Sequence, residues 1–519
     1  MTTAAAAPVA VPGLRRNMVT ICAMTATIMQ ALDTTIANVA LPYMQGSLSA
    51  SQDQINWVLT SYICAAAIMT APVGWIANRF GRKRIFIICS AGFTIASVMC
   101  GVAQDINQMV LFRLLQGMFG AALVPLSQAV MLDSYALHER AKAMAIWGMG
   151  VMMGPIMGPS LGAWLTETYS WHWVFFVNIP FGIVTVAGLM IFMDETNKNL
   201  DLRFDWFGFL ALAIGIGSLQ VALDRGEQLG WLGSNEIIVE FIIAAVGFYY
   251  FFAHSFTTPK PFIQFAIFKD RNFVSGCVFM AVMGLVLYST MALSSPYLQN
   301  VIGYPIITAG LLLATRGSGT FVAMMLVGRL MKYIEARTLI IAGLSLTGFS
   351  LFYMTGWTDQ TGVREIVMVS IVQGFGFGLV FVPLSTVAFL TLPNHLRTDG
   401  TSMLTLMRNV ASSIGISVVI AQLTEGGRRD YAILSEHINP FNQAMQMPNV
   451  RSMIDMSSDG GRALADAMVA IQAQIIAFSQ DYQLVMFFIL GSIPLAIMIG
   501  STKVALRSQQ AATEHAVID

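Results

Sequence analysis

Charged side chains are scarce in this sequence. Asp, Glu, Lys and Arg together make up 11% of its 519 residues, whereas a soluble globular protein carries about 25%. The hydrophobic residues, 56% of the chain, form blocks of about 20, the length with which a helix crosses a hydrocarbon layer of roughly 30 Å. This composition excludes a soluble fold and predicts an all-α integral membrane protein that crosses the bilayer many times.

Signals for metal, nucleotide and catalytic sites are also lacking. The five cysteines lie inside apolar runs without metal-ligand spacing, so we interpret them as small core side chains. No G-x-x-x-x-G-K-[ST] loop occurs, which argues against direct use of ATP. The six histidines lie at helix edges or in loops, in no pattern typical of an active site. We therefore expect no enzyme and no cofactor, and the absence of a basic patch argues against nucleic-acid binding.

The apolar blocks predict fourteen membrane-spanning helices. They lie at 17–40, 55–77, 85–103, 107–131, 142–166, 172–193, 205–223, 235–254, 272–295, 306–328, 338–356, 365–391, 400–423 and 482–502. Basic residues concentrate in alternate connections, such as Arg79, Arg82, Lys83 and Arg84 between the second and third helices. Because positive residues stay on the cytoplasmic side, this bias places both termini in the cytoplasm.

The chain contains an internal repeat. "PYMQ" at 42–45 recurs as "PYLQ" at 296–299, and "LQGMFGAALVPLS" at 115–127 recurs as "VQGFGFGLVFVPLS" at 372–385. These matches align helices one to six with helices nine to fourteen in the same orientation, with helices seven and eight inserted between them. Such a parallel repeat predicts a transporter whose substrate site lies between two rocking halves near the membrane midplane.

The repeat divides the chain into five parts. We expect a cytoplasmic tail at 1–16, a six-helix bundle at 17–195, two inserted helices at 196–260, a second six-helix bundle at 261–503, and a cytoplasmic tail at 504–519. The second bundle includes a long loop at 424–481 on the non-cytoplasmic side. There, Leu464, Met468, Ile471, Ile475 and Phe478 fall on one face of an amphipathic helix, which either packs on the protein's own outer surface or docks a partner.

Asp33 is the most unusual residue of the first helix. A carboxylate at the centre of a spanning helix costs about 2.5–3.5 kcal/mol, so it faces a polar cavity or has a partner. Gln30, Asp33 and Thr34 fall on one stripe, with Asn38 at its edge, and this stripe can line an aqueous pathway. We expect Asp33 to take up and release a proton during transport. The alternative is an aspartate paired permanently with a neighbouring helix.

Other polar residues extend this candidate site. Arg113 stays charged at all relevant pH values, so it can hold Asp33 ionised or compete with the proton, unless it only reaches toward the membrane interface. Arg316 can attract an anionic substrate, balance Asp33, or serve a structural role. The residues expected to line the substrate cavity are Gln30, Thr34, Asn38, Gln116, Arg316 and Gln373. The repeat aligns Asp33 with Leu287, so coupling chemistry is expected in the first half only.

Two glycine-rich motifs indicate packing and gating. In "GMGVMMGPIMGPSLGA" (148–163), small residues every four positions make a flat face and the prolines bend the helix. We expect this fifth helix to form a stiff seam between the two halves. Its motif residues are Gly154, Pro155, Gly158, Pro159 and Gly162.

The short basic connection "GWIANRFGRKR" (74–84) is either a topogenic loop or a latch. As a latch, its arginines pair with helix ends in one state of the transporter only. The residues in question are Gly74, Arg79, Gly81 and Arg82.

Together these stretches resemble the major facilitator superfamily, in particular its fourteen-helix drug:proton antiporter family. "LDTTIANVALP" resembles the first-helix signature, which carries the coupling aspartate onto Asp33, and "LFRLLQGMFGAA" the fourth-helix motif whose arginine is Arg113. "GWIANRFGRKR" is similar to the loop motif G-x-x-x-D-R-x-G-R-[KR], and "GPSLGA" to the antiporter motif G-P-x-x-G-G. Asn78 stands in place of the loop motif's acid, and Ala163 in place of the last glycine.

Further stretches narrow the resemblance to the inner-membrane pumps of Emr-type (EmrB-like) systems. These are "WHWVFFVNIP" (171–180), "FDWFG" (204–208) and "LDRGEQLGW" (223–231). The resemblance implies a bacterial inner-membrane pump that exports hydrophobic and amphipathic drugs in exchange for protons. It also implies two partners, a periplasmic membrane-fusion adaptor (EmrA-like) and a TolC-like outer-membrane channel.

Other functions remain open from the sequence. A solute:proton symporter or an exporter of one metabolite has the same fold but a different direction or range of transport. A membrane enzyme or a non-transporting sensor predicts no solute flux, and a channel predicts flux without saturable exchange.

Overall fold

The computed structural model describes residues 13–499 except 137–138, 197, 201–202, 259–260, 394–395, 440–441, 443–446, 448–455 and 457. The tails expected at 1–16 and 504–519 therefore lie mostly or wholly outside the described residues. The regular elements in the described part are all helical. The first-half helices are α1 (Gly13–Ser47), α2 (Gln52–Thr70), α3 (Val73–Phe80), α4 (Arg82–Gly101), α5 (Ile106–Gly120), α6 (Leu123–Ser134), α7 (Arg140–Thr168), α8 (Trp173–Phe176) and α9 (Asn178–Phe192).

The remaining helices complete the chain. They are α10 (Trp206–Leu229), α11 (Asn235–Thr257), α12 (Arg271–Pro296), α13 (Ile306–Leu330), α14 (Ala336–Met354), α15 (Val363–Val387), α16 (Arg397–Glu436) and α18 (Asp459–Ser492). Short helical turns lie at Trp231–Gly233, Phe265–Lys269, Tyr297–Val301 and Ile493–Met498.

The number of membrane-spanning segments agrees with the sequence prediction. Thirteen stretches of the described chain are long and apolar enough to cross a bilayer, and the bent pair α2 and α3 makes a fourteenth. Pro72 precedes α3, and the two parts of this span meet at 55°. Since proline removes a backbone donor and clashes with the preceding turn, it accounts for a break at this place.

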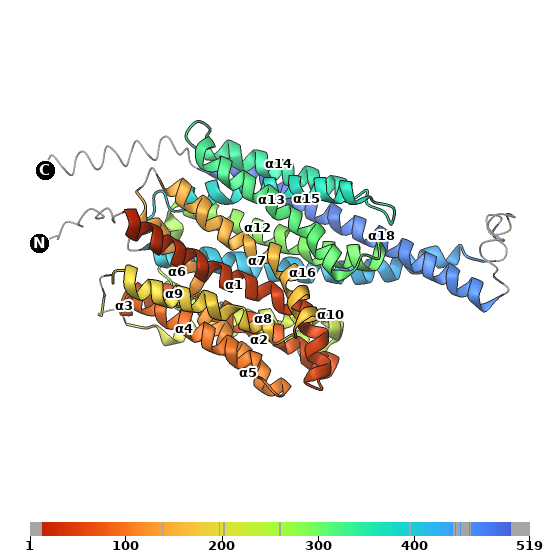
Figure 1. Cartoon of the computed structure of the whole chain (residues 1–519), viewed down its shortest axis with the longest axis horizontal. Coiled ribbons are helices and arrows are strands. Elements are labelled where there is room, and N and C mark those ends of the chain that lie inside the picture. Colours follow the sequence, from red (N-terminus) through yellow and green to blue (C-terminus); the bar gives the residue numbers. More distant parts are fainter. Residues whose placement is uncertain are drawn as a thin grey trace, which may run out of the picture.

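The helices pack as two bundles with the same internal pattern (Figure 1). In the first half, α1 contacts α7 and α9, α2 contacts α5, and α4 contacts α5 and α9. In the second half, the equivalent pairs are α12 with α16 and α18, α13 with α15, and α14 with α15 and α18. The repeat seen in the sequence is thus a repeat of helix packing.

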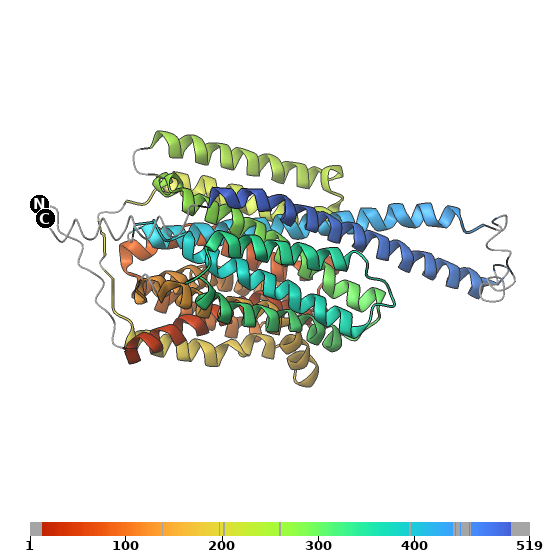
Figure 2. The same ribbon diagram turned by 90° about the horizontal axis from the view of Figure 1, so that it is seen from above.

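Helices from both halves meet along two surfaces. On one surface α7 packs against α13 and α15, and on the other α16 packs against α2, α3 and α6. The inserted helices α10 and α11 pack on each other, and α10 also contacts α2 and α16. In Figure 2, α11 lies at the edge of the molecule, outside the two bundles.

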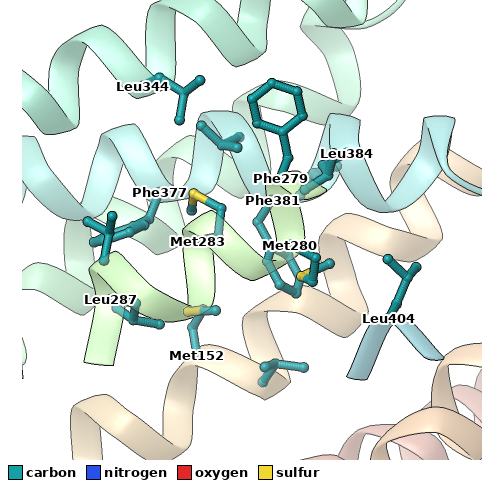
Figure 3. Packing of buried hydrophobic residues seen from close by; sticks show 14 of the residues in the cluster. Met152, Phe279, Met280, Met283, Leu287, Leu344, Phe377, Phe381, Leu384 and Leu404 are labelled. Atoms are coloured by element: carbon teal, nitrogen blue, oxygen red, sulfur yellow. The ribbon is translucent and has the colours of Figure 1, made fainter. Parts of the chain in front are cut away.

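The core between the halves is rich in methionine. Met152 of α7 belongs to the same buried cluster as Met280, Met283 and Leu287 of α12, and Figure 3 shows these side chains together. Phe381 of α15 belongs to the same cluster, and its ring also stacks on Trp147 of α7 with the ring centres 5.9 Å apart. Because methionine side chains are flexible and unbranched, such a core can repack when the halves move.

Two helices extend far beyond the others at one end of the molecule (Figures 1 and 2). Helix α16 has 40 residues and α18 has 34, so at 1.5 Å per residue they are about 60 and 50 Å long. Their outer parts form a hairpin, joined by hydrogen bonds from Arg429 to Gln480 (3.2 Å), from Gln480 to Asp430 (3.1 Å) and from Tyr431 to Asp466. We call this part the hairpin and the opposite end of the molecule the basic end.

The sequence predicted an amphipathic helix in the long loop, separate from the last span. This separation is wrong. Residues 459–492 form one continuous helix, so the predicted segment is the outer half of the last span. Ile475 and Phe478 are buried as expected, but Leu464, Met468 and Ile471 are 46%, 49% and 39% exposed. The buried positions of the outer turns are smaller residues, Ala465, Val469 and Ala473.

Candidate functional site

Asp33 is the centre of a buried polar cluster inside the first bundle. Its Oδ2 accepts a hydrogen bond of 2.7 Å from Arg113 Nη1, and its Oδ1 accepts bonds from Gln116 Nε2 (2.8 Å) and Asn178 Nδ2 (3.1 Å). These four side chains come from α1, α5 and α9, and all are fully buried. The carboxylate thus has a charged partner and two amide donors in a region without water access.

Arg113 is held from several sides. Its Nε donates to the Val58 carbonyl oxygen at 3.1 Å, and its Nη1 also donates to Gln116 Oε1 at 2.8 Å. The guanidinium carbon lies 4.2 Å from the centre of the Tyr62 ring and 5.6 Å from that of Phe175. Full burial excludes the alternative in which Arg113 reaches toward the membrane interface.

Separating the buried Asp33–Arg113 pair would cost a large amount of free energy. Breaking a buried ion pair by removing one partner costs about 3–5 kcal/mol, because the other charge is left without compensation. Neutralising Asp33 by a proton is the chemical event that removes the charge without removing the side chain. The cluster can therefore couple proton binding to the packing of α1, α5 and α9.

Asn178 was not among the residues expected to form this site. It is the first residue of α9, where it also donates to Ser97 Oγ at 3.0 Å. The only signal in the sequence was its place in "WHWVFFVNIP", which had no assigned role. Its contact with Asp33 joins residues 145 positions apart in the chain.

The other polar residues expected in the cavity take different places. Gln30 Nε2 lies 3.5 Å from the Tyr62 hydroxyl, and the Thr34 hydroxyl donates to the Ala31 carbonyl of its own helix. Asn38 is exposed. Gln373 is fully buried with its Nε2 4.0 Å from Met354 Sδ. Within the described ranges, no group of three His, Cys, Asp or Glu side chains could hold a metal ion.

A small cavity lies between the two halves, and Arg316 is on its wall. The lining residues are Met152, Ile156 and Pro159 of α7, Leu287 and Met291 of α12, and Leu313, Arg316 and Thr320 of α13. The cavity has a volume of about 30 Å³, which is enough for about two water molecules. Of the six residues expected to line a substrate cavity, Arg316 is the one on this wall.

A charged bridge joins the halves at the basic end. Asp133, at the end of α6, accepts a hydrogen bond from Arg397 Nη1 of α16 at 2.8 Å and also pairs with Arg82 of α4. Both arginine side chains are largely buried, with 8% and 10% exposed. The loop motif therefore contributes Arg82 to an ion-pair bridge between the halves, whereas Arg79 donates to the Leu200 carbonyl at 3.0 Å, in the segment that leads to the inserted helices.

Two glycines of the same motif occupy positions that disfavour a side chain. A Cβ on Gly74 would lie 1.9 Å from Asp399 Oδ1 of α16. Gly81 has φ of +97°, a conformation that favours glycine; a Cβ there would meet only the carboxylate of Glu195, which can move. Asn78, in place of the motif's acid, has its amide nitrogen 3.5 Å from Asp399 Oδ2. At this contact the carboxylate is therefore supplied by Asp399 of α16, in the second half, and not by the loop motif.

The glycine face of α7 packs within one bundle, contrary to the seam expected between halves. A Cβ on Gly154 would lie 2.1 Å from the Ala31 carbonyl carbon, and one on Gly158 2.0 Å from Thr35 Oγ1, both in α1. Gly162 faces Ile36 of the same helix. The Thr35 hydroxyl also donates to the Gly154 carbonyl at 3.0 Å.

The seam between the halves is formed by another face of α7. There Ile156 and Ser160 meet Gly317 and Gly310 of α13. A sequence pattern shows that a helix has a flat face but not which neighbour that face meets, which explains the error. Pro159 lines the cavity described above, and the side chain of Pro155 lies outside the described part of the chain.

Comparison with known proteins adds independent findings. Residues 23–416 match the family model of the Major Facilitator Superfamily. The chain is 34% identical over 466 residues to the multidrug export protein EmrB of Escherichia coli (strain K12), covering 89% of this chain and 90% of that protein. It is 32% identical over 477 residues to the fatty acid resistance protein FarB of Neisseria gonorrhoeae, covering 91% and 93%.

A solved structure shares the fold. The proton:xylose symporter XylE superposes with a TM-score of 0.56 at 14% identity, covering 93% of this chain and 96% of that chain. At this low identity the likeness concerns the fold alone.

Proposed function

The chain belongs to the major facilitator superfamily, and from that premise we propose that it is a multidrug efflux transporter that exchanges protons for hydrophobic and amphipathic compounds. The relatives with export and resistance roles support the efflux function. The observation that carries the coupling is the fully buried Asp33 paired with Arg113 at 2.7 Å. An ionisable residue inside a membrane bundle is functional by default, because its insertion is costly.

The exchange of protons for drug depends on whether Asp33 carries a proton. In the state described here, Arg113, Gln116 and Asn178 donate hydrogen bonds to the Asp33 carboxyl group. A proton that reaches Asp33 removes the charge that holds Arg113 and the two amides, so the helices that carry them are free to rearrange. Release of the proton on the other side restores the cluster, and the substrate site between the halves is exposed alternately.

A proton gradient supplies enough energy for this cycle. One elementary charge that crosses 100 mV yields about 2.3 kcal/mol, and a pH gradient adds to this value. We therefore propose no cofactor and no enzymatic activity.

We also propose the orientation and location of the transporter. The basic end, with Arg82, Arg140 and Arg397, faces the cytoplasm, because positive residues remain on that side. The hairpin then projects on the opposite side, into the periplasm if the membrane is the inner membrane of a bacterium with two membranes.

The hairpin is a suitable surface for a partner. Leu464, Met468 and Ile471 are large apolar side chains that remain exposed on its α18 arm. Exposed apolar groups outside the bilayer are typical of interaction sites. We propose that this arm contacts a periplasmic adaptor of the membrane-fusion (EmrA-like) type, and that a TolC-like channel completes the export path.

The test is drug-driven proton release in proteoliposomes. We expect Asp33→Asn to abolish proton release while the protein still folds, because asparagine keeps the shape and loses the titratable group. Asp224→Asn is the matched control: Asp224 is another carboxylate within a spanning helix, and it bonds to Thr60 and not to Arg113, Gln116 or Asn178. If the Asp33→Asn variant still released protons, the mechanism would be refuted. If the wild-type protein moved the drug and the proton in the same direction, a symporter would be favoured.

A further inference from the structure

Arg316 of α13 is a buried cation without a partner in the described part of the chain. Its side chain has no ion pair or hydrogen bond, and Nε and Nη2 are both buried and unsatisfied. The residue as a whole is 5% exposed. A buried polar group without a partner costs about 1–3 kcal/mol, and more when it is charged. Such a group in a native structure needs an explanation, for example an ordered water, an ion or a bound ligand.

The buried arginine of the first bundle, in contrast, has a charged partner, although its Nη2 is unsatisfied. Arg113 has the carboxylate of Asp33, the Val58 carbonyl and the Gln116 amide as acceptors. By the repeat, the position of Asp33 in the second half is taken by Leu287, which lines the same cavity as Arg316. The second half therefore has an arginine at the interface but an apolar residue where the first half has its acid.

Among the described residues of the second bundle, no acid pairs with Arg316. Asp481 of α18 is fully buried, but it forms no ion pair and both its carboxylate oxygens are unsatisfied within the described ranges. Asp33 is already paired with Arg113. A positive charge thus remains at the surface between the halves.

The remaining cavity wall is apolar. Met152 and Ile156 come from the first half, and Leu287, Met291 and Leu313 from the second. The only other polar side chain on the wall is Thr320, whose hydroxyl lies 3.1 Å from the Arg316 carbonyl and 2.9 Å from the Gly374 carbonyl. A ligand bound here would contact one guanidinium group, that of Arg316, and several flexible hydrophobic side chains.

We propose that Arg316 binds the acidic head group of amphipathic organic anions, whose apolar body lies against the methionine-lined wall. A guanidinium binds a carboxylate through two parallel hydrogen bonds, which gives both affinity and orientation. The inference rests on the proposed efflux function and names one substrate class for it. The cavity is too small for such a ligand in this state, but both halves line it, so it widens as they separate.

The test uses two probes with the same apolar chain and opposite charge, dodecanoate and dodecyltrimethylammonium. Their binding to the full-length protein in lipid nanodiscs is measured for wild type, Arg316→Gln and Arg316→Lys. We expect dodecanoate binding to weaken about 10- to 100-fold in Arg316→Gln and only a few-fold in Arg316→Lys. Arg408→Gln is the control, because Arg408 is also a buried arginine of this half but does not line the cavity.

A second variant keeps the test decisive if Arg316→Gln does not fold. Leu287→Asp places an acid on the same wall, as in the first half, and we expect it to neutralise Arg316 and abolish dodecanoate binding, whereas Leu287→Asn retains it. Equal binding of both probes to wild type, or unchanged dodecanoate affinity in Arg316→Gln or Leu287→Asp, would overturn the proposal.

The anion-binding experiment can fail or succeed independently of the test of the proposed efflux function. Proton coupling is measured independently with a cationic dye in wild type and Asp33→Asn. If wild type exports the dye with proton release but does not prefer dodecanoate, the anion site is wrong and the efflux function stands. If no compound drives proton release, the efflux function fails while the binding experiment still decides the anion site.

Discussion

Gly74 of α3 and Asp399 of α16 are in direct contact across the two halves, with no room for a side chain on the glycine. A Cβ on Gly74 would lie 1.9 Å from Asp399 Oδ1 and 2.8 Å from the Asp399 Cα. Because the second of these atoms belongs to the backbone, a rotamer change cannot relieve the clash. Closure of the basic end therefore depends on this glycine.

The first prediction is that Gly74→Ala shifts the transporter toward states in which the basic end is open. The added methyl group separates α3 from α16 only when the halves are closed, so it destabilises that state selectively. Spin-label distances across the basic end are expected to lengthen, and transport to slow. The control is Gly328→Ala, the repeat counterpart in α13, where the nearest atom to a Cβ is Lys142 Cα at 3.7 Å. An equal effect of both substitutions would contradict this reasoning.

The second prediction concerns the charged bridge at the same end. Asp133→Asn removes the charge that binds Arg82 and Arg397 together, leaving two arginines near each other. We expect the closed state to lose about 1 kcal/mol, roughly a fivefold change in the ratio of closed to open molecules. The measurement is the population of open molecules by the same spin-label distances. Asp194→Asn serves as the control, since Asp194 pairs with Arg15 within one half, and it should leave that population unchanged.

The third prediction distinguishes packing from gating in α7. Gly154→Ala brings a methyl group against the Ala31 backbone, whereas Gly150→Ala meets the flexible end of Met24, with the nearest atom at 3.1 Å, and touches Ile28 at an ordinary 3.6 Å. Overpacking of a tight interface costs about 1–3 kcal/mol. We expect a lower melting temperature in detergent for Gly154→Ala and little change for Gly150→Ala. If Gly154→Ala instead altered only the balance between open and closed states, the glycine face would be a gate after all.

The fourth prediction concerns the hairpin. Replacing Leu464, Met468 and Ile471 by serine removes its exposed apolar surface without touching the membrane bundles. We expect proteoliposome transport to be unchanged, while co-purification with a membrane-fusion adaptor is lost. The matched control replaces the exposed Gln472 and Gln474 of the same helix by serine. Undiminished adaptor capture by the triple variant would exclude this face as the contact.

Part of the fold was determined by the sequence alone. Hydropathy acts on each residue where it stands, so the number of spans, their order and the two-fold repeat follow from local composition. The presence of a costly acid, Asp33, and of Arg113 in the fourth span likewise required no knowledge of contacts. The bend between α2 and α3 lies at Pro72, although its angle of 55° was not predicted.

Only the tertiary structure decided which side chains meet. The Asp33 cluster joins residues 80, 83 and 145 positions apart, and the bridge from Arg397 to Asp133 spans 264. Gly154, Gly158 and Gly162 of α7 face α1 rather than the second half, and the large apolar residues of the hairpin remain outside. A single sequence shows that a helix has distinct faces, but the rotation that aims each face at a neighbour is set by the packing of all helices together.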